Sequence, residues 1–281
     1  MSGKQKEKIA FTLLSICGII VIVPIFAILL LLLIKGLPAF STGFLFGVNN
    51  TNKGVESIFP AILGTIYLVL VAVVVAVPLG ISSAIYLNEF ASNSAITRII
   101  RLSIVNLAGV PSVVYGLFGV GLFVVFLRFG TSILSGGLTL AFLILPVVIT
   151  ASEEALRTLP NSFREAALAL GASRIQTIQR IIVPNALPGM LTGSILGISR
   201  AAGETAPILF TVAAFFLPRL PRSIFDQAMA LPYHLYIITT QVPNVAEKYE
   251  YGTALTLVLL VFSLNITAMI IRNKFRRSKK W

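Results

Sequence analysis

The amino-acid sequence predicts an all-α polytopic membrane protein with six transmembrane helices. Of its 281 residues, 57% are hydrophobic and only 11% are charged, whereas a soluble domain carries about 25% charged residues. Long uncharged runs recur along the chain, and short clusters of basic residues separate them. So few charges cannot cover a water-facing surface of this size, and the composition therefore excludes a soluble enzyme and a disordered chain.

Five uncharged runs are long enough to cross a membrane. A spanning helix needs about 20 apolar residues, and the shortest of these runs holds 21. The runs cover residues 9–34, 57–88, 102–127, 129–152 and 251–271. A sixth candidate span, residues 185–217, is apolar except for Arg200 and Glu204 in its middle. The first run exceeds the roughly 7–15 apolar residues of a cleavable signal peptide, so we expect an uncleaved first helix.

The basic residues predict the orientation of these spans. With both termini in the cytoplasm, 15 of the 22 Lys and Arg residues fall in inner segments and six in outer ones, as the positive-inside rule requires. The remaining basic residue is Arg200. A seventh span over the uncharged residues 227–246 would place the basic C-terminal tail outside, so we expect an extramembrane or surface-lying segment there.

Three regions follow from this reading. Residues 1–56 comprise the cytoplasmic tail, the first span and an outer loop. Residues 57–271 form the core with spans two to six, a long inner loop at 153–184 and an outer segment at 218–250. Residues 272–281 are a basic cytoplasmic tail.

Several functional classes lack the residues that they need. One cysteine and one histidine are too few for a zinc or iron–sulfur site, and we expect Cys17 to be an apolar filler and give His234 no role. Nucleic acid is not an expected partner, because the basic residues lie at helix ends instead of on one soluble face; membrane lipid is expected. The chain contains no GxxxxGK[ST] loop, so we expect no ATP hydrolysis and no cofactor in this chain.

The 153–184 loop carries signals for two short helices. Ser162 with Glu165, and Ser173 with Gln176, match the capping box. Gly171 lies between them, where a C-terminal cap is expected. We therefore predict helices over about 163–170 and 174–183, with a glycine bend between them and Pro184 ending the second.

Each of these helices has an apolar stripe at helical spacing. The stripes consist of Phe163, Ala166, Ala167 and Leu170 in the first helix and Ile175, Ile178 and Ile182 in the second. Such a helix pair either packs on the ends of its own membrane helices or fits a groove on a partner protein. The spacing alone does not choose between these two alternatives.

The fifth span combines a small-residue stripe with a charged pair. Gly189, Gly193 and Gly197 lie four residues apart, which permits close approach of a second helix. Arg200 and Glu204 are also four apart and lie about 60° from this stripe, so we expect them to border the packed interface. Pro207 predicts a kink just beyond Glu204.

Two roles are open for this pair. Ionisable groups inside a membrane are costly unless they are paired or hydrated, and they mark functional sites by default. Arg200 and Glu204 either neutralise each other structurally or form a polar station on a translocation path, where a guanidinium suits phosphate or sulfate oxygens. The two roles do not exclude each other.

Two motifs resemble those of known transporter families. The EAA loop of ABC-importer permeases is similar to a pattern in the 153–184 loop: Glu165-Ala166-Ala167, then Gly171, then Ile181-x-Val183-Pro184. Val183 stands where that family usually has leucine. The string RAAGETAPILFT at 200–211 closely resembles the signature of the PstA-type permease subunits of phosphate ABC transporters, and segments at 59–65 and 106–117 agree with it.

The resemblance implies a type I ABC importer permease (MetI-like) fold and a role as the plasma (inner) membrane subunit of an ATP-driven phosphate importer. It implies a translocation path containing Arg200 and Glu204. It also implies contact with a separate ATPase through Phe163, Glu165, Ala166, Ala167, Leu170 and Gly171. The implied partners are a PstB-like ATPase dimer, which would hold ATP and Mg²⁺, a PstC-like sister permease and a PstS-like phosphate-binding protein.

Three other functions compete with this one. A permease for sulfate or molybdate would share the EAA loop, but the GETAP string disfavours it. A secondary transporter would need ionisable groups on several spans and usually an inverted repeat, whereas only one span here carries charge. An intramembrane enzyme would need a nucleophile or a metal site, which Arg200 and Glu204 do not supply.

Overall fold

The computed structural model describes residues 3–47, 57–217 and 220–277, and these residues are mainly helical, without any β-strand among them. Twelve α-helices occur in this part of the chain. They are α1 (Gly3–Gly36), α2 (Thr42–Phe46), α3 (Phe59–Ile85), α4 (Ala95–Ala108), α5 (Ser112–Gly119), α6 (Ile133–Arg157), α7 (Ser162–Ala169), α8 (Arg174–Thr177), α9 (Val183–Gly203), α10 (Ala206–Thr211), α11 (Leu231–Thr240) and α12 (Glu247–Arg277). Wider π-helical turns extend three of them, at Tyr86–Phe90, Val120–Phe126 and Ile178–Ile182.

Five helical stretches in the described residues are long and apolar enough to cross a membrane. They are Ala10–Ala39, Phe59–Phe90, Ile133–Arg157, Arg174–Gly203 and Glu247–Phe275. A sixth span exists if α4 and α5, which meet at 103°, count together. These stretches confirm the all-helical membrane fold.

The third predicted span, residues 102–127, is not one continuous helix. The chain turns sharply between α4 and α5, at Gly109, Val110 and Pro111. Pro111 has no N–H to donate, and it disfavours helical geometry at the residue before it. The N–H groups of Gly109 and Val110 instead close α4 by bonding to carbonyls three residues back.

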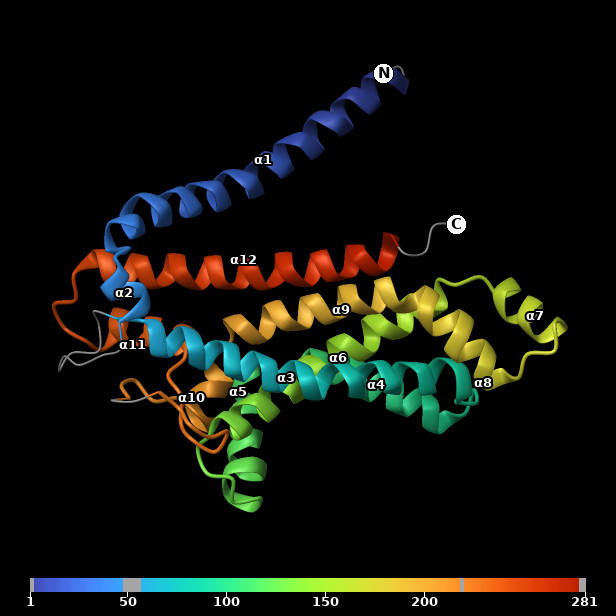
Figure 1. Cartoon of the computed structure of the whole chain (residues 1–281). Helices are drawn as coiled ribbons and strands as arrows, with labels where there is room; N and C mark the ends of the chain where they lie inside the picture. The colour runs from blue at the N-terminus through green and yellow to red at the C-terminus, as the bar shows by residue number, and fades with distance from the viewer. Residues whose placement is uncertain (1–2, 48–56, 218–219, 278–281) are drawn as a thin grey trace.

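Helix α6 lies in the middle of the bundle and packs between α3 and α9 (Figure 1). Its side chains Leu140, Leu143 and Ile144 are fully buried. A Cβ added at Gly189 of α9 would lie 2.6 Å from the Cβ of Ala155 on α6, and one at Gly193 would collide with Ala151. The predicted small-residue stripe is therefore confirmed as the line along which α9 approaches α6.

Helix α1 stands apart from the bundle except near its C-terminal end (Figure 1). There Gly36 packs against the backbone of Tyr251, and Lys35 Nζ lies 2.9 Å from Glu247 Oε2 of α12. The apolar side chains along the rest of α1 are exposed. Cys17 is one of these exposed positions, which fits its expected place on an apolar helix.

Residues 227–246 correct one expectation, because the first half of this segment is not surface-lying. Met229 and Leu231 are fully buried, and the Leu231 N–H donates to Thr65 Oγ1 of α3 at 2.9 Å. Gly64 has room for no side chain because the Met229 carbonyl lies directly against it. The segment has too few apolar residues to span a membrane. Its apolar side chains pack between α3 and α12.

Candidate functional site

The loop between α6 and α9 forms two short helices, as predicted, but one of its caps differs. Ser173 and Gln176 make the full capping box at α8. At α7 the residue before the helix is Asn161, which has helical backbone geometry and no side-chain cap. The helix thus begins with Ser162 itself, and the Glu165 N–H bonds to the Asn161 carbonyl at 3.1 Å. The predicted box of Ser162 and Glu165 is therefore wrong.

Gly171 ends the first helix as predicted. Its φ is +82°, a left-handed conformation that glycine adopts without strain. This bend lets the Gly171 N–H bond to the Leu168 carbonyl at 3.0 Å and the Ala172 N–H bond to the Ala167 carbonyl at 3.1 Å. The chain then turns back toward α8.

Pro184 does not end the second helix, contrary to the prediction. α8 continues through the π-helical turn Ile178–Ile182 into α9, with Pro184 in the first turn of α9. The Val183 N–H bonds five residues back, to the Ile178 carbonyl. This wider turn lets the helix continue past a residue that has no N–H to donate. The loop is therefore joined rigidly to the fifth span.

The apolar stripes divide into a buried base and an exposed tip. Ala167 is 3% exposed, and Ile178 and Ile182 of the second helix are buried as well. Leu170 is 88% exposed and Ile175 is 58% exposed. Phe163 is half-buried against the core, whereas Glu165 and Ala166 are exposed. The base therefore packs on the chain's own helices, as the first alternative predicts, while the tip remains exposed in this chain and its fit to a partner stays a prediction.

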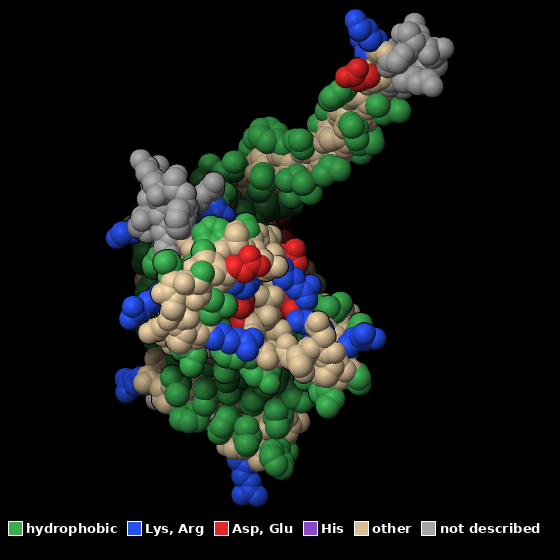
Figure 2. Space-filling model, turned by 90° about the vertical axis from the view of Figure 1, so that its right-hand side faces the viewer, with side chains coloured by type: hydrophobic (Ala, Val, Ile, Leu, Met, Phe, Trp, Pro, Cys, Tyr) green, Lys and Arg blue, Asp and Glu red, His purple; other side chains and the backbone are tan. Residues whose placement is uncertain are grey.

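Charged side chains gather at the end of the molecule that carries α7 and α8 (Figure 2). Arg164 of α7 pairs with Glu89 at the end of α3, with 2.6 Å between Nη2 and Oε1. Arg101 of α4 pairs with Glu153 of α6, with 2.8 Å between Nε and Oε1. Sequence reasoning missed Glu89. Its signal was an acidic residue placed directly after a long apolar run, at a helix end where the dipole disfavours negative charge.

Arg200 and Glu204 form a pair, with 3.2 Å between Nε and Oε1. Their side chains are 33% and 17% exposed, so both are partly buried. α9 ends at Gly203, and Glu204 has extended backbone geometry. The break thus falls at Glu204 instead of beyond it, because Pro207 sits in the first turn of α10, where a missing N–H costs nothing.

Two broken helices meet near this pair. At Gly116 of α5, an added Cβ would lie 3.1 Å from Pro207 Cα, so α5 packs directly on α10. Tyr115 belongs to the same buried cluster as Ala201 and Ile208. Irregular backbone at membrane depth is tolerated only where it is buried in protein or lines a watery cavity. The irregular backbone between α9 and α10 therefore lies against packed protein, next to α5.

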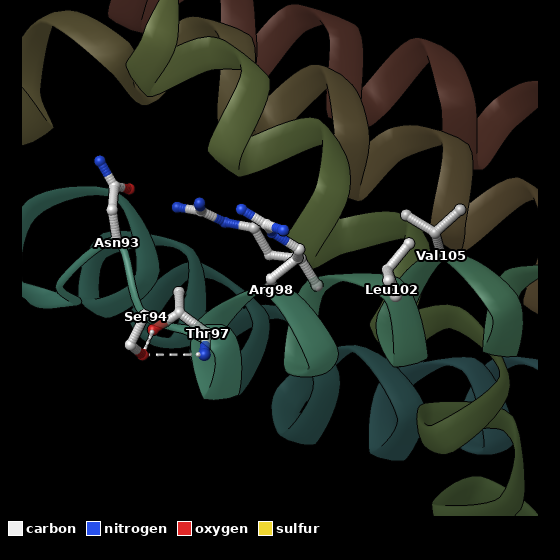
Figure 3. Close-up of a pocket in the computed structure, with 7 residues that line it drawn as sticks. Asn93, Ser94, Thr97, Arg98, Leu102 and Val105 are labelled. Atoms are coloured by element: carbon white, nitrogen blue, oxygen red, sulfur yellow. Dashed lines mark hydrogen bonds between the residues drawn. The ribbon is translucent and has the colours of Figure 1, made fainter.

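A groove of about 420 Å³ runs along one face of α4 (Figure 3). It is lined by Asn93, Ser94, Thr97, Arg98, Arg101, Leu102 and Val105. The Arg98 side chain extends into the groove and makes no ion pair with a described residue. From the sequence we counted Arg98 and Arg101 only among the inner basic residues that orient the spans. A groove cannot be recognised from the order of residues along the chain.

His234 is 1% exposed and its ring stacks on Phe215, with 5.5 Å between ring centroids. Burial lowers the pKa of His234 to about 4, so the ring is neutral at pH 7. Among the described residues, no group of three or more His, Cys, Asp or Glu side chains could hold a metal ion.

Comparison with known proteins identifies the family of this chain. Residues 76–281 match the family described as binding-protein-dependent transport system inner membrane component. The chain belongs to this family of ABC-importer permeases.

Its relatives include phosphate permeases. The chain is 39% identical over 216 residues to phosphate transport system permease protein PstA 1 of Mycobacterium tuberculosis (strain CDC 1551 / Oshkosh), covering 76% of this chain and 70% of the relative. It is 31% identical to the probable ABC transporter permease protein YqgI of Bacillus subtilis (strain 168), over 95% of each chain. The resemblance to PstA-type permeases is thereby confirmed.

Solved structures show the same fold. A chain of the MetNI methionine ABC transporter, in inward-facing conformations, aligns with a TM-score of 0.59 at 16% identity, over 79% of this chain and 94% of that one. A chain of a bacterial alginate ABC transporter aligns with a TM-score of 0.67 at 12% identity, over 94% and 93%. The protein is thus a multi-pass membrane permease with the MetI-like fold.

Proposed function

We propose that this chain is the transmembrane permease subunit of an ATP-driven inorganic phosphate importer, and that its 153–184 loop couples it to a separate ATPase. The observation that carries the coupling is the division of the loop into a buried base at Ala167 and a tip at Leu170 that is 88% exposed. An exposed apolar side chain on a firmly seated helix suits a groove on a partner protein.

Phosphate as the cargo is supported by the relatives and by Arg200. Several relatives are named as phosphate transport permeases, at 32–39% identity. Arg200 presents a guanidinium beside a helix break. The planar array of N–H donors on a guanidinium matches the arrangement of phosphate oxygens. Because Glu204 already pairs with this guanidinium, the contact with phosphate is weak, which favours release over retention.

The remaining parts of the importer are assigned by the same proposal. The end with α7 and α8 faces the cytoplasm, where a PstB-like ATPase dimer holds ATP and Mg²⁺. A PstC-like sister subunit forms the other half of the path. A PstS-like phosphate-binding protein docks at the opposite end, on the outer loops around 36–56 and 218–250. Nucleotide-driven closure of the ATPase then moves α7 and α8, and with them the spans around Arg200.

Reconstitution of the complete complex in lipid vesicles tests this function. The chain is combined with the candidate ATPase, sister permease and binding protein, and uptake of labelled phosphate is followed with and without ATP. We expect ATP-dependent phosphate uptake that neither sulfate nor molybdate competes away. Competition by either oxyanion would indicate that the chain belongs to an importer of that oxyanion instead. Phosphate uptake by the chain alone, without nucleotide, would contradict the proposal.

A further inference from the structure

Arginines from α4 and α8 satisfy the end of α3. The last carbonyls of any helix lack partners within the helix, and α3 closes with the turn Tyr86–Phe90. Arg101 of α4 donates to the Leu87 carbonyl at 2.7 Å. Arg174 of α8 donates to the Glu89 carbonyl, and its guanidinium lies 5.2 Å from the centre of the Phe90 ring. Cations at this position are also favoured by the helix dipole.

Glu89 is an acidic side chain in a place that is unfavourable for one. It is 9% exposed and lies at the C-terminal end of a helix, where the dipole disfavours negative charge. Arg164 of α7 donates to both carboxylate oxygens, Nη2 to Oε1 at 2.6 Å and Nε to Oε2 at 3.3 Å. A buried carboxylate needs such a partner, since a lone buried charge is strongly destabilising.

The connectivity of this pair distinguishes it from the Arg157–Glu153 pair nearby. Arg157 and Glu153 pair within α6, four residues apart, and can only support their own helix. Glu89 and Arg164 are 75 residues apart and join α3 to α7. α9 follows α8 by continuous helix. No continuous helix joins α3 to the loop, so the ion pair is what connects α3 to α7.

We propose that the Glu89–Arg164 pair, with Arg174, is a mechanical joint that transmits movement of the α7–α8 loop to α3. This inference rests on the proposed function, in which an ATPase moves the loop. Apolar packing at Ala167 is non-directional, so by itself it does not fix the direction in which α7 would pull on the bundle. A guanidinium that holds both oxygens of a carboxylate fixes the distance and the orientation together. α3 packs along α6 through most of its length, so a pull at Glu89 reaches the core.

The inference is tested in the reconstituted complete complex by the ratio of phosphate transported to ATP hydrolysed, which falls when movement of the loop no longer reaches the spans. We expect Glu89→Gln to lower that ratio roughly tenfold, within the range typical of coupling between two sites, with wild-type yield of assembled complex. Arg164→Lys keeps the charge but cannot hold both oxygens, so its ratio should fall between those of wild type and Glu89→Gln. The matched control is Arg157→Gln, which removes an arginine from the same end of the molecule without unlinking two elements. It should keep the wild-type ratio.

A double-variant cycle tests whether the two side chains act together, and the comparison of uptake, hydrolysis and assembly separates transmission from simple support of the fold. If the two side chains act as one joint, Glu89→Gln combined with Arg164→Gln should be no worse than either change alone. A wild-type ratio in Glu89→Gln would overturn the inference. So would equal losses of uptake and hydrolysis, or failure of both Glu89→Gln and Arg164→Lys to assemble, since the pair would then serve only folding. Absence of ATP-driven phosphate uptake in the wild-type complex would instead refute the proposed function.

Discussion

At the residue scale, the position of Arg200 is defined by one partner and one break. Glu204 neutralises its charge, and the end of α9 between them leaves irregular backbone beside the pair. Pairing offsets the cost of placing two charges in an apolar span, and both side chains remain partly exposed. The structural role and the transport role can therefore be separated only by removing the partners one at a time.

Arg200→Ala should lower ATP-dependent phosphate uptake about tenfold, the loss expected when a charge-assisted hydrogen bond of about 1.5 kcal/mol or more is removed. Initial rates of labelled phosphate uptake in vesicles with matched protein levels measure it. If Arg200 contacts phosphate, combining Arg200→Ala with Glu204→Ala should not restore uptake. Recovery in the double variant would show that the single variant failed only because Glu204 was left unpaired.

His234 makes stability depend on pH. Its pKa falls from 6.5 in the unfolded chain to about 4 in the folded one, so the unfolded state binds the proton first as the solution is acidified. Stability is therefore constant above about pH 6.5 and falls by up to about 3 kcal/mol as the pH approaches 4. Melting temperatures of the detergent-solubilised protein at several pH values should show this fall. His234→Phe can still stack on Phe215 but cannot be protonated, so the fall in melting temperature at low pH should be smaller in this variant. Identical pH dependence in both proteins would exclude His234 as the cause.

At the element scale, the loop and the fifth span form one continuous piece. The capping box at Ser173, the π-helical turn after Thr177 and the uninterrupted helix through Pro184 join α8 to α9. α7 is attached to this piece through the bend at Gly171 and through its buried base. The geometry of that bend therefore sets where Leu170 points.

Gly171→Ala should impair coupling because of backbone strain. The added Cβ meets no atom within 4 Å, yet φ is +82°, which costs a residue with a side chain about 1–2 kcal/mol. We expect α7 to reorient and phosphate uptake per ATP hydrolysed to fall, while the protein stays in the membrane. Gly130→Ala is a matched control, since Gly130 also has positive φ (+66°) and open space around it. Equal coupling in both variants would mean that the bend does not position the tip.

The contact between α9 and α6 should tolerate no added carbon. Gly189→Ala places a Cβ 2.6 Å from Ala155 Cβ between two rigid helices, and overpacking of this kind costs about 1–3 kcal/mol. We expect a lower melting temperature of the solubilised protein, and recovery when Ala155→Gly is added. Gly203→Ala is the control on the same helix, because nothing lies within 4 Å of its added Cβ. A normal melting temperature for Gly189→Ala would show that the helices separate at little cost.

At the scale of the whole molecule, the sequence predicts the spans well because each one needs a long uncharged run. The same reasoning fails at Val110, since a run without charge does not reveal a bend, although Pro111 marks a helix boundary. It also fails at Glu89, whose partner Arg164 is 75 residues away and becomes a neighbour only in the folded chain. Arg200 and Glu204 could be paired from the sequence because their contact is local to one helix.

The orientation of the molecule in the membrane is a prediction of the charge distribution. Cys17 is the one cysteine of the chain, so Cys17→Ser gives a background without thiols into which single cysteines can be introduced. Leu170→Cys lies on the exposed tip of the loop, and Gln241→Cys lies in an exposed stretch after α11 at the opposite end. A membrane-impermeant maleimide should label position 241 in intact cells and position 170 only in inside-out vesicles. The Cys17→Ser background should take up no label in either preparation. Labelling of position 170 from outside would place α7 and α8 away from any cytoplasmic ATPase. That result would remove the coupling role from the loop and leave the polar station at Arg200 without a source of movement.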